Sequence, residues 1–354
     1  MRHKVNNFKP FAAIKIVTPL QRDGFSQSMA QVKLSLAQLR SGILLTASLA
    51  AIAYLLRLVP GFNLFSPLVL AILLGILARN VVGVAPICQP GISFAMRRVL
   101  RVAVVLLGVQ LSVLQVLSVG IAGLLIMMIT LFSTFWLTCW LGRRLGVNSS
   151  LTRLIAAGTS ICGASAVIAA STTTESSDED ITYAIAIVTL FGTVSMLLYP
   201  LLSGQFMPEA FGLWCGVSIH EVAQVIAAAF QVSPISGEVA SLSKLSRVLW
   251  LAPMLLMLGT VSKASQPKSQ VVLPWFVIYF MGLILLNSLN FIPQGLKPII
   301  GQFNQVLLTI SMAAMGLETR LNQIQKIGAK PLYLGALSWL FISGFSYSLI
   351  KLFY

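Results

Sequence analysis

The stretch Gly158-Thr159-Ser160-Ile161-Cys162-Gly163-Ala164-Ser165-Ala166-Val167-Ile168-Ala169-Ala170 decides the fold. It lies in an apolar segment of membrane-spanning length, yet its first eight residues hold two Gly, two Ser and one Thr. Such residues weaken a helix, because each glycine costs about 1 kcal/mol relative to alanine and small hydroxyl groups compete for backbone hydrogen bonds. We therefore predict that a helix is interrupted here.

The same pattern returns 58 residues later as Gly216-Val217-Ser218-Ile219-His220-Glu221-Val222-Ala223-Gln224-Val225-Ile226-Ala227-Ala228, with seven of thirteen positions identical. His220, Glu221 and Gln224 replace small residues of the first copy, and such polar groups are costly inside a bilayer and typical of functional sites. We predict that the two stretches face each other in one polar site near the middle of a membrane. Repeated, interrupted helices of this kind are typical of secondary transporters.

The composition indicates an all-α, polytopic membrane protein. The 354 residues are 57% hydrophobic and 9% charged, whereas a soluble domain carries about 25% charged residues. Because a span needs about 20 apolar residues, we predict about eleven spans. Their approximate bounds are 41–57, 64–82, 99–118, 120–142, 152–171, 180–203, 210–230, 241–262, 273–292, 299–317 and 332–351.

The net charge of +15 is interpreted as an orientation signal rather than as a nucleic-acid-binding surface, because the basic residues gather on one side of the predicted topology. Only Arg57, Lys244, Arg247, Lys297 and Lys351 fall on the other side. The positive-inside rule then predicts a cytoplasmic amino terminus and a periplasmic carboxyl terminus. Residues 1–40 are predicted to form a basic cytoplasmic arm, and residues 41–354 a single transmembrane domain.

The linker from Ser171 to Asp180 carries four acidic residues and no basic one. The predicted topology places this linker outside, in agreement with the positive-inside rule. Ser177 with Asp180 three residues later is predicted to cap the next helix. A solvated cap is the favoured interpretation, and a vestibule that attracts cations is the alternative.

A second internal echo supports a repeat. Gly108 and Gly120 are twelve residues apart, as are Gly316 and Gly328, and upstream of them Asn80 aligns with Asn287 one residue out of that register. The matched spans lie seven apart, so the copies are predicted to have inverted orientations. The two glycine-rich stretches lie only two spans apart, which would make them parallel. Either one of them is re-entrant or the repeats are permuted, and the sequence leaves this open.

His220 and Glu221 are the leading candidates for binding and ion coupling, because an ionisable group at mid-span couples proton movement to transport. A satisfied structural pair between helices is the alternative. The segment HEVAQ has Gln224 where a zinc protease needs histidine. The four cysteines are scattered singly, so we predict no metal, no cofactor and no enzymatic activity.

Ser160, Cys162, Ser165, Ser218 and Gln224 are candidate substrate ligands. With the free N–H groups of broken helices they suit a small oxyanion, although small residues also serve close helix packing. Lys244 and Arg247 share a helix face near the predicted outer end of their span. They are interpreted either as an electrostatic guide for an anion or as residues that snorkel to the interface.

Long blocks of the chain resemble the YeiH-type family of bacterial multi-pass membrane proteins, which carry the label of sulfate exporters. The blocks include GTSICGASA at 158–166, DEDITYAIAIVTLFGT at 178–193, FGLWCGVSIHEVAQV at 211–225, KLSRVLWLAP at 244–253 and GLETRL at 316–321. The resemblance covers residues from about Leu39 to the end. It implies an inner-membrane protein similar in architecture to inverted-repeat carriers of the bile-acid and cation/proton antiporter class.

We therefore expect a secondary transporter that moves a small anion, such as sulfate, sulfite or an organosulfonate, across the bacterial inner membrane. The alternatives are a sodium- or proton-coupled carrier of another small solute, a membrane enzyme and a channel. The coupling ion, H+ or Na+, the substrate, the direction of transport and the oligomeric state, a homodimer included, stay open.

Overall fold

The computed structural model describes residues 23–353 apart from 114–119, 175, 252, 255–274 and 321–327. The described residues form helices, turns and loops without strands, as expected from the composition. Five helical segments are long and apolar enough to cross a membrane, which fits a polytopic membrane protein. These segments are Leu39–Leu56, Ala122–Leu145, Asp178–Gln205, Leu296–Glu318 and Ala329–Phe353.

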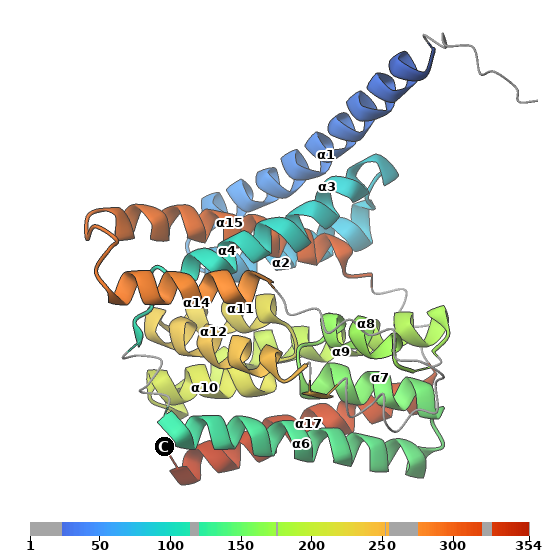
Figure 1. The fold of residues 1–354 in the computed structure, drawn as a ribbon, viewed down its shortest axis with the longest axis vertical. Helices are drawn as coiled ribbons and strands as arrows, with labels where there is room; N and C mark the ends of the chain where they lie inside the picture. The colour runs from blue at the N-terminus through green and yellow to red at the C-terminus, as the bar shows by residue number, and fades with distance from the viewer. Residues whose placement is uncertain are drawn as a thin grey trace, which may run out of the picture.

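The helices gather into two bundles, one in the upper and one in the lower half of Figure 1. We call the upper one the α2–α15 bundle, after its most extensive helix pair. It consists of α1 (Asp23–Leu56), α2 (Pro67–Leu77), α3 (Gln89–Phe94), α4 (Leu100–Leu107), α14 (Trp275–Ser288) and α15 (Leu296–Glu318). Two π-helical turns, Ala78–Val82 and Ala95–Val99, extend α2 and join α3 to α4.

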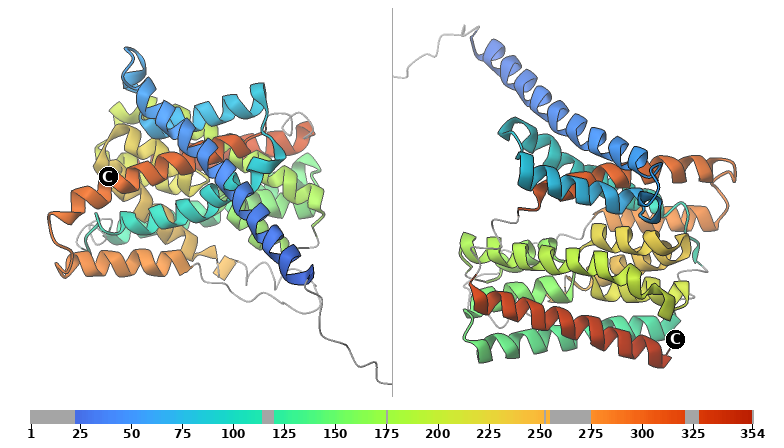
Figure 2. Two further views of the ribbon diagram at one scale, coloured as in Figure 1. Left: turned by 90° about the horizontal axis from the view of Figure 1, so that it is seen from above. Right: turned by 180° about the vertical axis from the view of Figure 1, so that it is seen from behind.

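The lower group is called the hairpin bundle. It consists of α6 (Gly120–Leu145), α7 (Ser149–Ser160), α8 (Ala164–Ser171), α9 (Asp178–Leu198), α10 (Pro208–Ser218), α11 (Val222–Val232), α12 (Pro234–Leu249) and α17 (Ala329–Phe353). The views in Figures 1 and 2 show α6, α9 and α17 running along the length of this bundle. A 3-10 segment, Tyr199–Gln205, continues α9 towards α10.

Both glycine-rich stretches interrupt a helix, as predicted. α7 ends at Ser160 and α8 begins at Ala164, with Gly163 between them at a φ of 70°. α10 ends at Ser218 and α11 begins at Val222. A positive φ is readily adopted only by glycine, so Gly163 is the residue that permits the first interruption.

The first interrupted segment folds back on itself instead of crossing the molecule. The hydroxyl of Ser150, at the start of α7, donates to the hydroxyl of Ser176, beyond the end of α8, at 2.7 Å. Closer to the interruption, a Cβ on Gly158 would lie 2.7 Å from a methyl group of Val167. α7 and α8 are therefore the two arms of a re-entrant hairpin.

The second interrupted segment is also a hairpin. Gly212 of α10 packs against Ser236 of α12 and Gly216 against Ala240 and Ser243, so α10 and α12 run parallel. Only Ser233 separates α11 from α12, and these two helices run antiparallel. α10 and α11 consequently have opposite directions.

The hairpins enter from opposite ends of the hairpin bundle, because α9 connects them along its length (Figure 1). This arrangement settles the question of orientation: both stretches are re-entrant, and they point towards each other. The predictions that 152–171 and 210–230 are spans are therefore wrong. Neither segment contributes a crossing to the expected count of about eleven.

The prediction that the acidic linker and the basic loop before α7 lie on opposite sides of the membrane was also wrong. Because α7 and α8 form a hairpin, Ser176 lies on the same face as Asn148 and Ser150, next to the basic residues Arg143 and Arg144. The predicted cap itself is confirmed, since the Ser177 hydroxyl accepts the Asp180 N–H at 3.1 Å.

Other predicted spans are shifted or only partly described. The helical segment expected over 99–118 runs from Gln89 to Leu107, and 114–118 lie outside the described residues. α12 begins at Pro234 rather than near 241. Residues 255–274, which include the end of the predicted eighth span and the start of the ninth, are likewise outside the described residues.

The second echo corresponds to two equivalent contacts in the α2–α15 bundle. The Asn80 side-chain amide donates to the Thr319 carbonyl at 3.0 Å, and the Asn287 amide donates to the Leu111 carbonyl at 2.7 Å. Thr319 and Leu111 each lie three residues beyond a matched glycine. Paired contacts of this kind are what an internal repeat predicts.

Close helix contacts in the α2–α15 bundle depend on facing glycines. A Cβ on Gly75 would lie 2.5 Å from the Ala313 carbonyl oxygen and 2.9 Å from the Gly316 Cα. Small residues let helix backbones approach in a membrane, where packing replaces the hydrophobic driving force.

We predict that Gly75→Ala destabilises the protein, because an overpacked helix contact costs about 1–3 kcal/mol. The measurement is the apparent melting temperature in detergent. Gly282→Ala is the matched control, because a Cβ at this aligned position meets no atom within 4 Å. Equal melting temperatures for the two variants would contradict the glycine contact.

We predict that Asn148→Cys and Ser176→Cys react with an impermeant thiol reagent from one side of the membrane. Met207→Cys, in the exposed residue before α10, is expected to react from the other side. Labelling of the wild-type protein measures the background reaction of the four native cysteines. If Ser176→Cys and Met207→Cys were instead labelled from the same side, α7 and α8 would together cross the membrane, which would contradict the re-entrant hairpin.

Candidate functional site

The tips of the two hairpins meet around a pair of cations on α12. Lys244 and Arg247 each have a relative exposure of 0%. Lys244 Nζ donates to the Ile161 carbonyl at 3.0 Å and to the Ile219 carbonyl at 2.6 Å, which joins one tip to the other. Full burial of both side chains excludes snorkelling to an interface, because neither side chain reaches the surface.

Arg247 binds the last turns of both arms that enter the site. Its Nε donates to the Ser160 carbonyl at 2.7 Å and its Nη2 to the Thr159 carbonyl at 3.1 Å, both in α7. Its Nη1 donates to the Val217 carbonyl in α10. The carbonyls at a helix carboxyl end lack intrahelical partners and carry partial negative charge, so Lys244 and Arg247 neutralise the ends of α7 and α10.

Glu221 holds the opposite kind of helix end. Its carboxylate accepts the Thr189 hydroxyl at 3.0 Å and the backbone N–H of Ala164, the first residue of α8. A carboxylate is stabilised at a helix amino end by the free N–H groups and the helix dipole. Gly163 makes room for it, since a Cβ there would lie 2.5 Å from Glu221 Cγ. Unlike the two cations, Glu221 is only half-buried.

Gln224 connects α11 to α9. Its Nε2 donates to the Thr189 carbonyl and to the Thr193 hydroxyl, both at 3.1 Å. A Cβ on Gly192 would clash with Gln224 Oε1, so the absence of a side chain at Gly192 admits this contact. The geometry gives Gln224 a role in holding the second hairpin against α9.

The remaining predicted ligands differ in their surroundings. The hydroxyls of Ser160 and Ser218 donate back to Ala156 and Trp214 of their own helices, each at 2.5 Å. Ser165 is exposed, on α8. The structure therefore brings the predicted residues to the two tips but engages several of their side chains with the protein itself.

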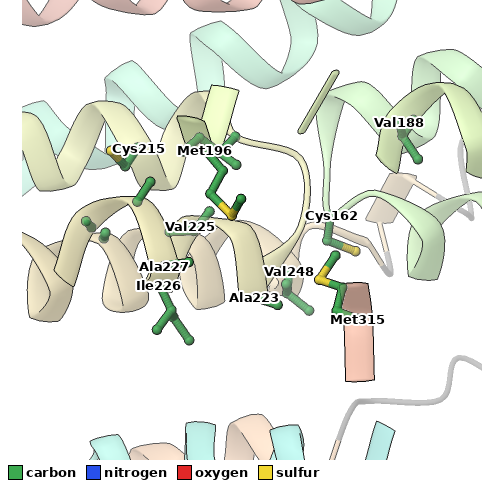
Figure 3. Close-up of a cluster of buried hydrophobic side chains, with 14 of the residues drawn as sticks. Cys162, Val188, Met196, Cys215, Ala223, Val225, Ile226, Ala227, Val248 and Met315 are labelled. Atoms are coloured by element: carbon green, nitrogen blue, oxygen red, sulfur yellow. The ribbon is translucent and has the colours of Figure 1, made fainter. Parts of the chain in front are cut away.

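Cys162 and His220 lie at the tips themselves. Cys162 belongs to a cluster of buried side chains together with Met315 of α15 and Val188 of α9 (Figure 3). His220 is 1% exposed, and its Nδ1 has no hydrogen-bond partner within the described residues. An unpaired buried nitrogen costs about 1–3 kcal/mol, so His220 Nδ1 is a candidate atom for a ligand contact.

The amino end of α11 is the open helix end of the site. Glu221 precedes α11, but its side chain makes no capping hydrogen bond to this helix. The α8 end, in contrast, already holds the Glu221 carboxylate. Free N–H groups at a helix start bind anions, and α11 supplies them beside His220.

The residues that the sequence analysis missed are on α9. Contacts to Glu221 and Gln224 come from Thr189, Gly192 and Thr193. These residues lie in the block 178–193 that carries the family resemblance, but no functional role was predicted for them. Their spacing of three and four residues on one helix face within an apolar span is the signal that was available. No cluster of His, Cys, Asp and Glu suited to a metal ion occurs among the described residues.

Comparisons with known proteins agree on a family. The family described as conserved hypothetical protein 698 matches residues 41–335. The UPF0324 inner membrane protein YeiH of Escherichia coli K12 is 40% identical over an alignment of 294 residues, which covers 79% of this chain and 84% of the relative. A UPF0324 membrane protein of Bordetella pertussis is 37% identical over an alignment of 330 residues, which covers 88% of this chain and 94% of the relative.

We predict that Arg247→Met and Lys244→Met each destabilise the protein. A lost hydrogen bond to a charged group costs about 1.5–3 kcal/mol, and buried carbonyls left unpaired add to this. Lys330→Met, at an exposed position in the first turn of α17, is the matched control. The measurement is thermal unfolding in detergent, and melting temperatures of the site variants equal to that of the control would contradict the assigned role.

Proposed function

This chain belongs to the UPF0324 family of membrane proteins, and we propose that it is a secondary transporter of a small anion. The observation that carries the proposal is the meeting of two opposed re-entrant hairpins at a charged site. Secondary transporters bind their substrates at interrupted helices of this kind, near the middle of the bilayer.

The charge of the site favours an anion. Lys244 and Arg247 carry two positive charges and Glu221 carries one negative charge, which leaves one positive charge at the tips when His220 is neutral. The donors of the two cations are directed to backbone carbonyls. The anion is therefore proposed to bind the N–H groups at the start of α11, with His220 beside it and the cations acting through their field.

Movement of the hairpin bundle against the α2–α15 bundle is the proposed means of alternating access. α11 contacts both α2 and α15 at the border between the two bundles. The Ser66 N–H donates to Gln231 Oε1 across that border. The helices contact one another far less across this border than within either bundle, which supports relative movement of the two bundles.

The proposed location is the bacterial inner membrane, as for the relatives. The connection between α6 and α7 lies on a basic face of the molecule, which carries Arg143, Arg144 and Lys330. The positive-inside rule assigns this face to the cytoplasm. The amino terminus is then cytoplasmic and the carboxyl terminus periplasmic. A small oxyanion containing sulfur, such as sulfate, sulfite or an organosulfonate, is the proposed substrate, on the strength of the resemblance to YeiH-type proteins.

A carrier of another solute, coupled to sodium or protons, is the second candidate. The observation that favours it is Glu221, a half-buried acidic residue at the tips, because a carboxylate within a membrane suits a coupling cation. Such a carrier would depend on sodium or pH and would be indifferent to sulfur oxyanions.

We predict that proteoliposomes containing the protein exchange radiolabelled sulfate or sulfite in a saturable manner. Glu221→Gln and His220→Ala should each lower the rate by about tenfold or more, which corresponds to about 1.4 kcal/mol. Glu318→Gln, a carboxylate held by Gln89 and Ser93 in the other bundle, is the control for charge removal. Transport at the wild-type rate by both site variants would remove the assignment.

A further inference from the structure

The Glu221 carboxylate occupies a position that suits an anionic ligand. It accepts a hydroxyl from Thr189 and a backbone N–H from the first residue of α8. A helix amino end together with a hydroxyl donor is a common anion-binding arrangement in proteins. The protein thus carries an anion of its own at one of the two helix starts in the site.

The other ionisable groups around Glu221 differ from it in accessibility. Lys244 and Arg247 of α12 are fully buried and bonded to carbonyls, and His220 and Cys162 at the tips are 1% and 5% exposed. Glu221 alone among these five is half-buried. An incoming anion therefore reaches the Glu221 residue more readily than it reaches either cation.

Two negative groups near each other in a buried site repel strongly, because the effective dielectric constant there is low. With Glu221 charged, the tips hold one net positive charge, and a dianion would leave the site with a net negative charge. Uptake of one proton by Glu221 removes the repulsion between its carboxylate and the dianion. It also raises the net charge of the empty site from +1 to +2. A dianion and that proton together bring the occupied site to neutrality.

We propose that the Glu221 carboxylate takes up one proton and loses its negative charge when the transported ligand binds. The site then binds a dianionic oxyanion and a proton together. The proton comes from solvent and is bound by a carboxylate oxygen of Glu221, and no other bond is made or broken. This inference rests on the proposed function and specifies the charge of its substrate and its coupling ion.

The test is titration calorimetry of the purified protein with sulfate, in buffers of different ionisation enthalpy and at several pH values. We expect uptake of about one proton per sulfate, and a dissociation constant that falls about tenfold for each unit by which pH is lowered. Glu221→Gln should bind sulfate without proton uptake and without this pH dependence. Glu209→Gln, an exposed carboxylate in the first turn of α10, should behave as the wild type does.

Two results would overturn the inference while the proposed anion carrier survives. One is sulfate binding by the wild type without proton uptake, which requires no working Glu221 variant to interpret. The other is binding of a monovalent probe, methanesulfonate, with no binding of sulfate. Binding of neither anion at any pH would overturn the proposed anion site along with the inference.

Discussion

The structure depends on neutralising helix ends that are buried at the centre of the hairpin bundle. An interrupted helix exposes carbonyls and N–H groups that have no partner along the chain, and water is excluded from most of this site. Lys244 and Arg247 satisfy the carbonyl ends of α7 and α10, and Glu221 satisfies the amino end of α8. A fully buried cation pair in an apolar bundle is explained by this requirement.

The interruption itself could be predicted from the sequence, because glycine and small hydroxylated residues in an apolar segment weaken a helix wherever they occur. The polar residues of the second copy were identified for the same reason. The change of direction could not be predicted, since hydropathy is the same whether the second arm continues or folds back. It is decided by contacts such as that between Ser150 and Ser176, 26 residues apart.

The roles of individual side chains were less predictable than their location. Gln224 was expected to bind the substrate and Lys244 to guide it by charge or to snorkel to the interface. Their hydrogen bonds reach Thr189 and Ile161, which are distant in sequence. The sequence pattern shows which groups are costly to bury but not which of them satisfy one another. Thr193 illustrates the converse, because the spacing of Thr189 and Thr193 on one helix face gives little indication of their partners.

The bonds of Lys244 also limit how the site opens. One ammonium group joins Ile161 of the first tip to Ile219 of the second, so lifting either tip alone would leave a buried carbonyl without its donor. Neither hairpin is therefore suited to serve as an independent flap, and the two tips are expected to travel as one rigid body together with α12.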